Sequence, residues 1–222
     1  MPRGAQDTRP RLTRERVLQA AVALADEAGI QALSMRKLGE QVGVEAMSLY
    51  KHVANKDDLL DGMVDSVFGE IELAPDEPDW RIAMRDRATS VRSVLKRHAW
   101  AVPLMQSRTN PGPSTLSHLD ALIGILRAAG FSVILTAHAL SVIDAYVYGF
   151  AMQEKALPFN TEERSTEVIE DILAAMPEDE WPHLVEFSRE HVLKPGYDYG
   201  KEFAWGLELV LDGLEVSLRR SP

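Results

Sequence analysis

Apolar residues recur every three or four positions along almost the whole chain, which is the spacing of helices with one buried face. No run of alternating apolar and polar residues is long enough to argue for a sheet. The periodic segments are separated by stretches rich in proline and glycine, at residues 73–79, 107–114, 156–161, 176–182 and 194–200. The pattern therefore predicts an all-α protein.

Residues 13–71 predict four helices, of which two are very short. Thr13 can cap the first helix, and Gly29 suits the position just past its end. Ser34 caps a short helix that ends before Gly43, and another short helix follows through about Val53. Short helices do not persist alone in water, so we expect their neighbours to hold these two in place.

A fourth helix is predicted over residues 55–71. Asn55 with Asp58 three residues later forms a start that resembles a capping box. Further helices are predicted at residues 79–97, 98–106, 114–129, 132–155, 162–175, 180–193 and 200–219.

Two of these helices are unusually apolar. Residues 132–155 are apolar on nearly all sides, and residues 200–219 carry a second apolar face of Trp205, Leu209 and Val216 besides the expected one. A helix that is apolar all round needs more neighbours than a peripheral helix has. Such helices form the centre of the bundle or also face a second subunit, and the presence of two favours the second subunit.

The 222 residues include no cysteine, which excludes a disulfide scaffold, a cysteine-liganded zinc site and a thiol nucleophile. The N-terminal residues are basic but lack the apolar core of a secretion signal. The most apolar stretch contains His138 and Asp144, and an unpaired carboxylate is costly inside a membrane. We therefore expect a cytoplasmic protein with a buried helix at this place and no membrane contact.

The net charge of −10 argues at first against a nucleic-acid partner. The charge is unevenly divided, however, because residues 1–60 hold nine Lys or Arg and eight Asp or Glu, whereas the rest holds fifteen and twenty-six. Phosphate binding needs only a local cationic face, and an acidic remainder helps to limit contact to that face.

Residues 35–53 have the spacing of a helix-turn-helix. Apolar residues would pack the two helices together, Gly39 would allow their close approach, and Gly43 stands where the turn needs positive φ. This geometry presents residues 45–51 to a major groove. Tyr50, His52 and Lys56, which follow within a few residues, carry groups that bind phosphates.

The run VGVEAMSLYKHVANKDDLL, residues 42–60, resembles the DNA-binding domain of the tetracycline-repressor (TetR) family of transcriptional regulators. Residues 128–132, 148–154, 203–208 and 212–214 extend the resemblance, more weakly, to the tetracycline-repressor type of C-terminal domain. The resemblance implies a homodimer, a three-helix DNA reader with a linking helix at 55–72, and a C-terminal helical domain that binds a small effector. It also implies that helices 132–155 and 200–219 pair with their mates in the dimer.

Carried over by position, the resemblance implies DNA contacts along and around the second short helix. Ala46-Met47 replaces a polar–proline pair of the tetracycline repressors, so base preference should differ, and Lys51 could reach a phosphate or a guanine edge. The expected DNA-binding residues are Arg36, Glu45, Ala46, Met47, Ser48, Tyr50, Lys51, His52 and Lys56.

The resemblance does not extend to the magnesium–tetracycline site. Pro103 stands at the place of the metal-chelating histidine, and Glu72 at that of the histidine that holds the drug. A different effector is therefore expected, and no cofactor or metal is called for. Pocket candidates chosen by chemistry are an apolar box and three polar anchors, any of which could instead be an ordinary core residue: Trp100, Met105, Tyr146, Phe150, His98, His138 and Asp144.

No phosphate loop, nucleophile elbow or metal-binding motif is present, so we expect no enzyme. The predicted organisation is a flexible basic arm (1–12), a helix-turn-helix domain (13–60) and an effector-binding and dimerisation domain (73–222). The arm either settles into a minor groove or has no role. The predicted function is a ligand-responsive regulator, most simply a repressor that leaves a palindromic operator when its effector binds. The alternative is a helical small-molecule- or protein-binding module that binds no DNA; activation in place of repression stays open.

Overall fold

The computed structural model describes residues 11–157, 179–194 and 196–220. The chain divides into two compact units, residues 1–129 and residues 130–222. The described part contains helices and turns but no strand, and the predicted all-α class is confirmed. The predicted helix at 162–175 and most of the basic arm lie outside the described residues.

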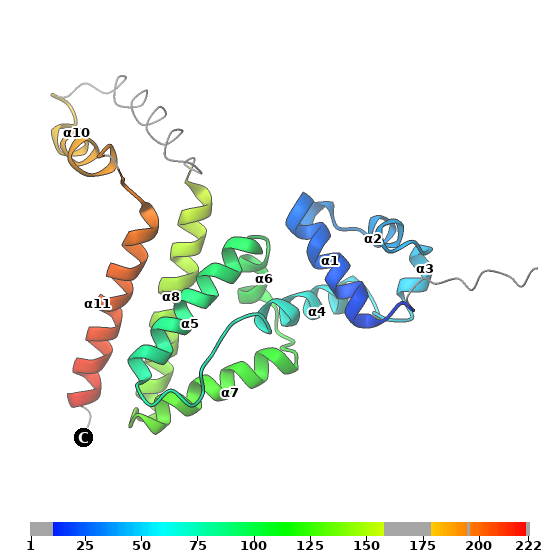
Figure 1. Ribbon diagram of the computed structural model, residues 1–222, viewed down its shortest axis with the longest axis horizontal. Helices are drawn as coiled ribbons and strands as arrows, with labels where there is room; N and C mark the ends of the chain where they lie inside the picture. Colours follow the sequence, from blue (N-terminus) through cyan, green and yellow to red (C-terminus); the bar gives the residue numbers. More distant parts are fainter. Residues whose placement is uncertain (1–10, 158–178, 195, 221–222) are drawn as a thin grey trace, which may run out of the picture. The chain divides into compact units, whose positions relative to one another are not determined.

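The first unit contains seven α-helices and one short 3₁₀ turn within its described residues (Figure 1). They are α1 (Arg14–Ala28), η1 (Ile30–Ala32), α2 (Met35–Val42), α3 (Ala46–Leu49), α4 (Lys56–Phe68), α5 (Trp80–Arg97), α6 (Ala101–Ser107) and α7 (Pro113–Ala128).

The predicted N-terminal caps form hydrogen bonds in the structure. The side chains of Thr13, Ser34 and Asn55 each accept from the backbone amide three residues further on, and each begins its helix. Gly43 has φ of 73°, the left-handed conformation that the sequence predicts at the end of α2.

In the first unit, three helix boundaries differ from the predicted ones by three or four residues. Helix α3 ends at Leu49 because the amides of Lys51 and His52 bond to carbonyls three residues back, which tightens the chain into a turn. Helix α4 ends at Phe68 instead of residue 71, and α6 begins at Ala101 instead of residue 98. The 3₁₀ turn η1 has no counterpart among the predicted elements.

The core of the first unit is closed. Each helix from α1 to α4 contributes side chains that solvent does not reach, among them Val17, Leu38, Leu49 and Met63. Beyond α4, the guanidinium of Arg87 on α5 is buried and its Nε donates to His118 Nε2 on α7, 3.1 Å away. The apolar contacts hold the two short helices in place, as their length requires.

The second unit contains, within its described residues, α8 (Val133–Ala156), α10 (Pro182–Phe187) and α11 (Tyr199–Arg220). Residues 188–192 form a π-helical turn directly after α10, so the predicted helix at 180–193 is present but irregular. Helices α8 and α11 lie side by side (Figure 1). On α11, Phe203, Leu207, Leu211 and Leu214 are buried whereas Trp205, Leu209 and Val216 are exposed, which confirms its two predicted apolar faces.

Aromatic rings join α8 to α11. Phe150 on α8 stacks on Tyr199, with centroids 4.8 Å apart, and meets Phe203 edge-on. The hydroxyl of Tyr146 donates to the backbone carbonyls of Glu202 and Phe203. A methyl group at Gly206 would overlap the Tyr146 ring, so this glycine makes room for the contact.

Among the described residues, α8 is long and apolar enough to cross a membrane, with a mean hydropathy of 1.5. The folded chain, including α11, buries 39% of that stretch. The core helix of a soluble protein has the same length and composition, and the half-buried Asp144 fits that interpretation.

Candidate nucleic-acid interface

Helices α2 and α3 form the predicted helix-turn-helix. A methyl group on Gly39 would press against the backbone of Val44 and Ala46, so this glycine lets the turn lie directly on α2. Leu38 on α2 and Leu49 on α3 are fully buried and hold the pair together. These are the tasks that the sequence predicts for Leu38, Gly39 and Leu49.

The surface that α3 presents is mainly exposed. Met47 is 75% exposed and Tyr50 44%, and the side chains of Glu45 and Lys51 are exposed beside them. Ala46, Ser48 and His52 are half-buried. An exposed methionine on a short helix, with a lysine and a tyrosine hydroxyl next to it, offers both an apolar contact and phosphate-binding groups to a groove.

A network of polar contacts ties the turn after α3 to α1 and α4. The Arg14 guanidinium of α1 donates two hydrogen bonds to the Asp58 carboxylate of α4, at 2.6 and 3.0 Å, and a third to the carbonyl of His52. The backbone amide of Ala54 donates to the same carboxylate, which departs from a standard capping box. The hydrogen bonds from Arg14 hold the pKa of Asp58 below its usual value although burial opposes this, so the pair is charged at neutral pH.

Two further cations have partners within the segment from α1 to the start of α4, which we call the head. The ammonium of Lys56 donates to the carbonyl of Leu33, 3.2 Å away, which ties the start of α4 to the segment before α2. Arg36 on α2 lies 3.7 Å from Glu40, and its side chain is 81% exposed. Asp57 and Asp58 stand in the first turn of α4, where their negative charge opposes a phosphate at the helix amides. Phosphate contact is therefore expected from side chains.

Two family models match this chain. Residues 17–63 match the model for bacterial regulatory proteins of the tetR family, and residues 74–218 match the tetracyclin repressor-like C-terminal domain. Together the matches include the helix-turn-helix and most of the remaining chain. The chain belongs to the tetR family.

Proteins of similar sequence or structure match this chain along nearly its whole length. The transcriptional repressor DrrR1 of Streptomyces coeruleorubidus is 33% identical over 96% of this chain and 81% of its own. The class C tetracycline repressor of Escherichia coli is 28% identical over 92% and 91%. The structure of the TetR family protein ActR from Streptomyces coelicolor, in complex with actinorhodin, matches with a TM-score of 0.76 and 26% identity over 94% of this chain and 99% of that one. The predicted class of ligand-responsive transcriptional regulator is confirmed.

Two of the predicted pocket residues in this tetR-family chain join the head to the end of α5. His98 is buried, with Nδ1 2.8 Å from Asp26 of α1 and Nε2 3.1 Å from Glu70. The indole of Trp100 donates to the same Asp26 oxygen at 2.6 Å. Burial would raise the pKa of Glu70, but hydrogen bonds from Arg97 and His98 bring it below its usual value. The polar atoms of His98 and Trp100 are thus engaged in contacts within the protein.

The other five candidates are divided between the units. Met105 is half-buried on α6, in the first unit. His138, Asp144, Tyr146 and Phe150 lie on α8 in the second, where His138 is exposed and the two rings pack on α11. An effector pocket built from all seven residues stays a prediction.

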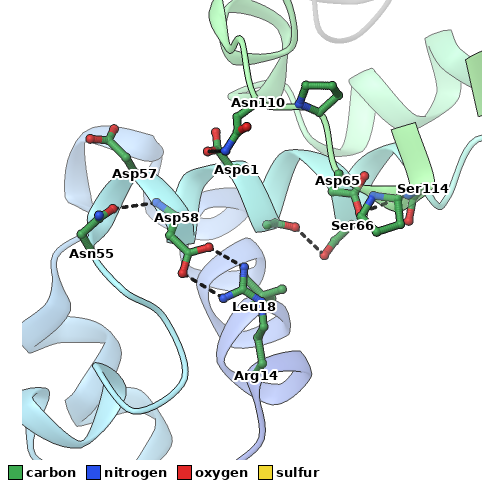
Figure 2. Close-up of a pocket in the computed structure, with 14 residues that line it drawn as sticks. Arg14, Leu18, Asn55, Asp57, Asp58, Asp61, Asp65, Ser66, Asn110 and Ser114 are labelled. Carbon is green, nitrogen blue, oxygen red and sulfur yellow. Dashed lines mark hydrogen bonds and ion pairs between the residues drawn. The ribbon is translucent and has the colours of Figure 1, made fainter. Parts of the chain in front are cut away.

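A groove of about 470 Å³ lies elsewhere, along α4 (Figure 2). Its walls come from the start of α1, from α4 and from the segment before α7, and it contains none of the seven candidates. The residues that sequence reasoning missed lie here: Asp57, Asp61 and Asp65 recur every four positions on α4. That spacing marks one helical face and was the available signal.

Pro103 stands within α6, and the backbone amide of Glu72 bonds to Ser90 Oγ after the end of α4. The described residues contain no group of three His, Cys, Asp or Glu side chains placed to hold a metal ion.

Proposed function

We propose that this regulator is a repressor that binds a palindromic operator as a homodimer and leaves it when a small-molecule effector binds. The observation that carries the proposal is the exposed surface of α3, held at fixed geometry by the Arg14–Asp58 pair. The relative named DrrR1 is a repressor, which supports repression over activation. The cytoplasm is the compartment where such a protein meets its DNA.

The dimer is proposed to form through α8 and α11. Trp205 is 68% exposed and Val133 71%, although both belong to apolar helices. Large exposed apolar patches on a folded chain mark interaction sites, and a symmetric pair would cover both. The two heads would then fit successive major grooves, roughly 34–36 Å apart.

The effector is proposed to be a small molecule other than magnesium–tetracycline. ActR has been solved in complex with actinorhodin, which supports a small-molecule ligand for this type of C-terminal domain. Proline has no side-chain donor for a metal, so Pro103 does not replace a chelating histidine. The effector shifts DNA affinity only by its different affinity for the two orientations of the heads.

Binding to the duplex that flanks its own gene tests the proposal. Fluorescence anisotropy at low ionic strength should show salt-dependent binding, and light scattering should show a dimer. Failure to bind any such duplex, or a monomer at micromolar concentration, would favour a helical binding module over a DNA-binding regulator.

Base reading is assigned to Met47. Replacing Met47 by Ala should change which operator variants bind best, with a change of roughly 1–3 kcal/mol at the contacted base pair. Affinities for a panel of single-base operator variants measure this. An equal loss for all variants would show that Met47 does not read bases.

A further inference from the structure

Three carboxylates form a stripe along α4, which we call the α4 carboxylate stripe: Asp57, Asp61 and Asp65. They stand four residues apart and therefore share one face of the helix. Asp58, one residue further round, points to Arg14 on the head instead (Figure 2). Helix α4 thus offers carboxylates in two directions.

Residues 108–115, which join α6 to α7 and include the first turn of α7, bind every member of the stripe, and we call them the strap. Arg108 Nε donates to Asp61 Oδ1, while its Nη2 donates to the carboxylate of Asp57 at 3.2 Å and to the Asp57 carbonyl at 3.1 Å. The side chains of Arg108 and Asp61 are each only 18% exposed. A charge pair with so little solvent contact is costly to break, because the remaining charge loses both its partner and its hydration.

Asp65 is bound in a different way, through the start of α7. Its carboxylate accepts the amides of Thr115 and Ser114 at 2.8 and 3.3 Å and the Thr115 hydroxyl at 2.9 Å. The residue at the N-cap position of α7 is Gly112, which has no side chain to do this. A carboxylate from α4 therefore caps α7 across about fifty residues of sequence.

Gly112 is required for this arrangement. A methyl group added there would overlap the Asp65 carboxylate. The glycine therefore marks the place where the backbone of the strap comes closest to α4. The approach is confined to the first unit, where Figure 2 shows Asp61, Asp65, Asn110 and Ser114 converging.

We propose that Arg108 and Asp65 are positioning residues for operator binding: through them the strap holds α4, and with it the DNA-reading head, in one orientation. The inference rests on the proposed function, because it names the contacts that control the same head. Helix α4 starts directly after the turn that follows α3, and Arg14 with Asp58 fastens that turn to it. Whatever orients α4 therefore orients α3.

Releasing the strap should widen the range of head orientations. Only part of that range matches the operator, so the fraction of competent molecules and the apparent affinity fall together. A coupling of ordinary size corresponds to roughly a tenfold loss of operator affinity. Because Arg108 acts through α4 and contacts no phosphate in this proposal, the slope of log affinity against log salt should not change.

Spin labels provide a direct measurement, since the chain has no native cysteine to interfere. Gln41→Cys on α2 and Ser117→Cys on α7 place labels at exposed positions of the first unit. Pulsed dipolar spectroscopy on labelled chains mixed with an excess of unlabelled chains gives the distance distribution within one chain. Operator affinity is measured in parallel on the duplex that flanks the gene.

Arg108→Gln should broaden the distance distribution and weaken operator binding roughly tenfold, while Arg108→Lys should lie between it and the native protein. Gly112→Ala displaces Asp65 without removing a charge and should broaden the distribution as well; it serves as the second variant if Arg108→Gln does not fold. Lys194→Gln, which removes an exposed pair with Glu190 outside α8 and α11, should leave both readouts unchanged.

An unchanged distance distribution in both strap variants would overturn the proposal, and so would a broadened distribution with unchanged operator affinity. If the native protein bound no duplex at all, the proposed function would fail, whereas the distance measurement would still judge whether the strap holds the head.

Discussion

The DNA-reading head, from α1 to the start of α4, and the α8–α11 pair are stabilised in different ways. In the head, Val17, Leu38 and Leu49 are closed off from solvent, and charged contacts such as Arg14–Asp58 connect the outer ends of the helices. In the α8–α11 pair, rings fill the contact on one side, while Val133, Ile134 and Trp205 stay exposed on others. The head buries its large apolar side chains in its own core, whereas the helix pair keeps several of them exposed, and the proposed dimer would cover these.

The difference follows from what each region must supply. Apolar burial is strong but has no preferred direction, so it suits a surface whose proposed task is to hold two subunits together. Hydrogen bonds between charged groups demand defined geometry, so they suit a head whose angle decides whether it fits a groove. Four changes would break or sharpen this comparison.

The largest effect is expected from Trp205→Asp on α11. The exposed indole would lose a burial of roughly 3 kcal/mol, twice in a symmetric dimer, and two carboxylates would enter an apolar interface. The dimer dissociation constant should rise on the order of ten-thousandfold. Sedimentation or light scattering over a concentration series measures it.

Ala23→Asp adds the same charge to an exposed position of α1 and is the matched control. It should leave the dimer intact. A dimer that survives Trp205→Asp would move the interface away from α11.

Gly39→Ala should have the next largest effect, because the new methyl group meets backbone atoms of the turn and α3 must shift. We expect a loss of about 1–3 kcal/mol in unfolding free energy. Operator affinity should fall as well, which titration of the duplex would show.

Gly124→Ala is the corresponding control on α7, where a methyl group has open space. It should stabilise the protein by about 0.5–1 kcal/mol, since alanine is the better helix former. Equal effects of the two changes would contradict the close approach at Gly39.

Arg14→Gln should cost about 1–2 kcal/mol of unfolding free energy at neutral pH, because its pair with Asp58 is charged but partly exposed. The pKa of Asp58 is lowered in the folded protein, so the stabilisation is present above the ordinary carboxylate value near ~3.9 and is lost as pH falls through the lowered value. Urea unfolding at a series of pH values checks this.

The stabilities of the native protein and Arg14→Gln should therefore converge only in acid. Arg36→Gln, which removes an exposed pair on α2, should change stability by no more than about 0.5 kcal/mol at any pH. A stability difference for Arg14→Gln that did not depend on pH would exclude Asp58 as its cause.

The smallest effect is expected from Lys56→Ala. It should lower the slope of log affinity against log salt by about 1 and weaken operator binding a few-fold. Lys201→Ala on α11 removes a lysine that likewise bonds a carbonyl, that of Gly196, and should leave the slope unchanged. An unaltered slope for Lys56→Ala would mean that the Lys56 ammonium binds the Leu33 carbonyl and no phosphate.

Features that depend on neighbouring residues could be predicted from the sequence. The caps at Thr13, Ser34 and Asn55 and the left-handed Gly43 require only local geometry, and the sequence indicates each of them. The two apolar faces of α11 follow from spacing alone. The proposed DNA contacts were likewise placed by a pattern that spans about fifty residues.

Contacts across long stretches of chain could not be predicted in this way. Asp65 caps α7 through Thr115, which lies fifty residues further along the sequence. Asp26 contacts His98, which lies seventy-two residues further along. Nothing near Gly112 indicates which carboxylate will replace its missing cap. Such pairs depend on how helices pack, and periodicity shows which face is buried without showing against what.

The space that Gly206 leaves for the Tyr146 side chain has a consequence for assembly. The hydroxyl of Tyr146 enters it and fixes how far α8 can slide along α11. A paralogue with a bulkier residue there would present its outer surface in a shifted register. In the proposed dimer, we therefore expect chains with this glycine to pair with one another in preference to related chains without it, which would otherwise combine two unrelated operator preferences.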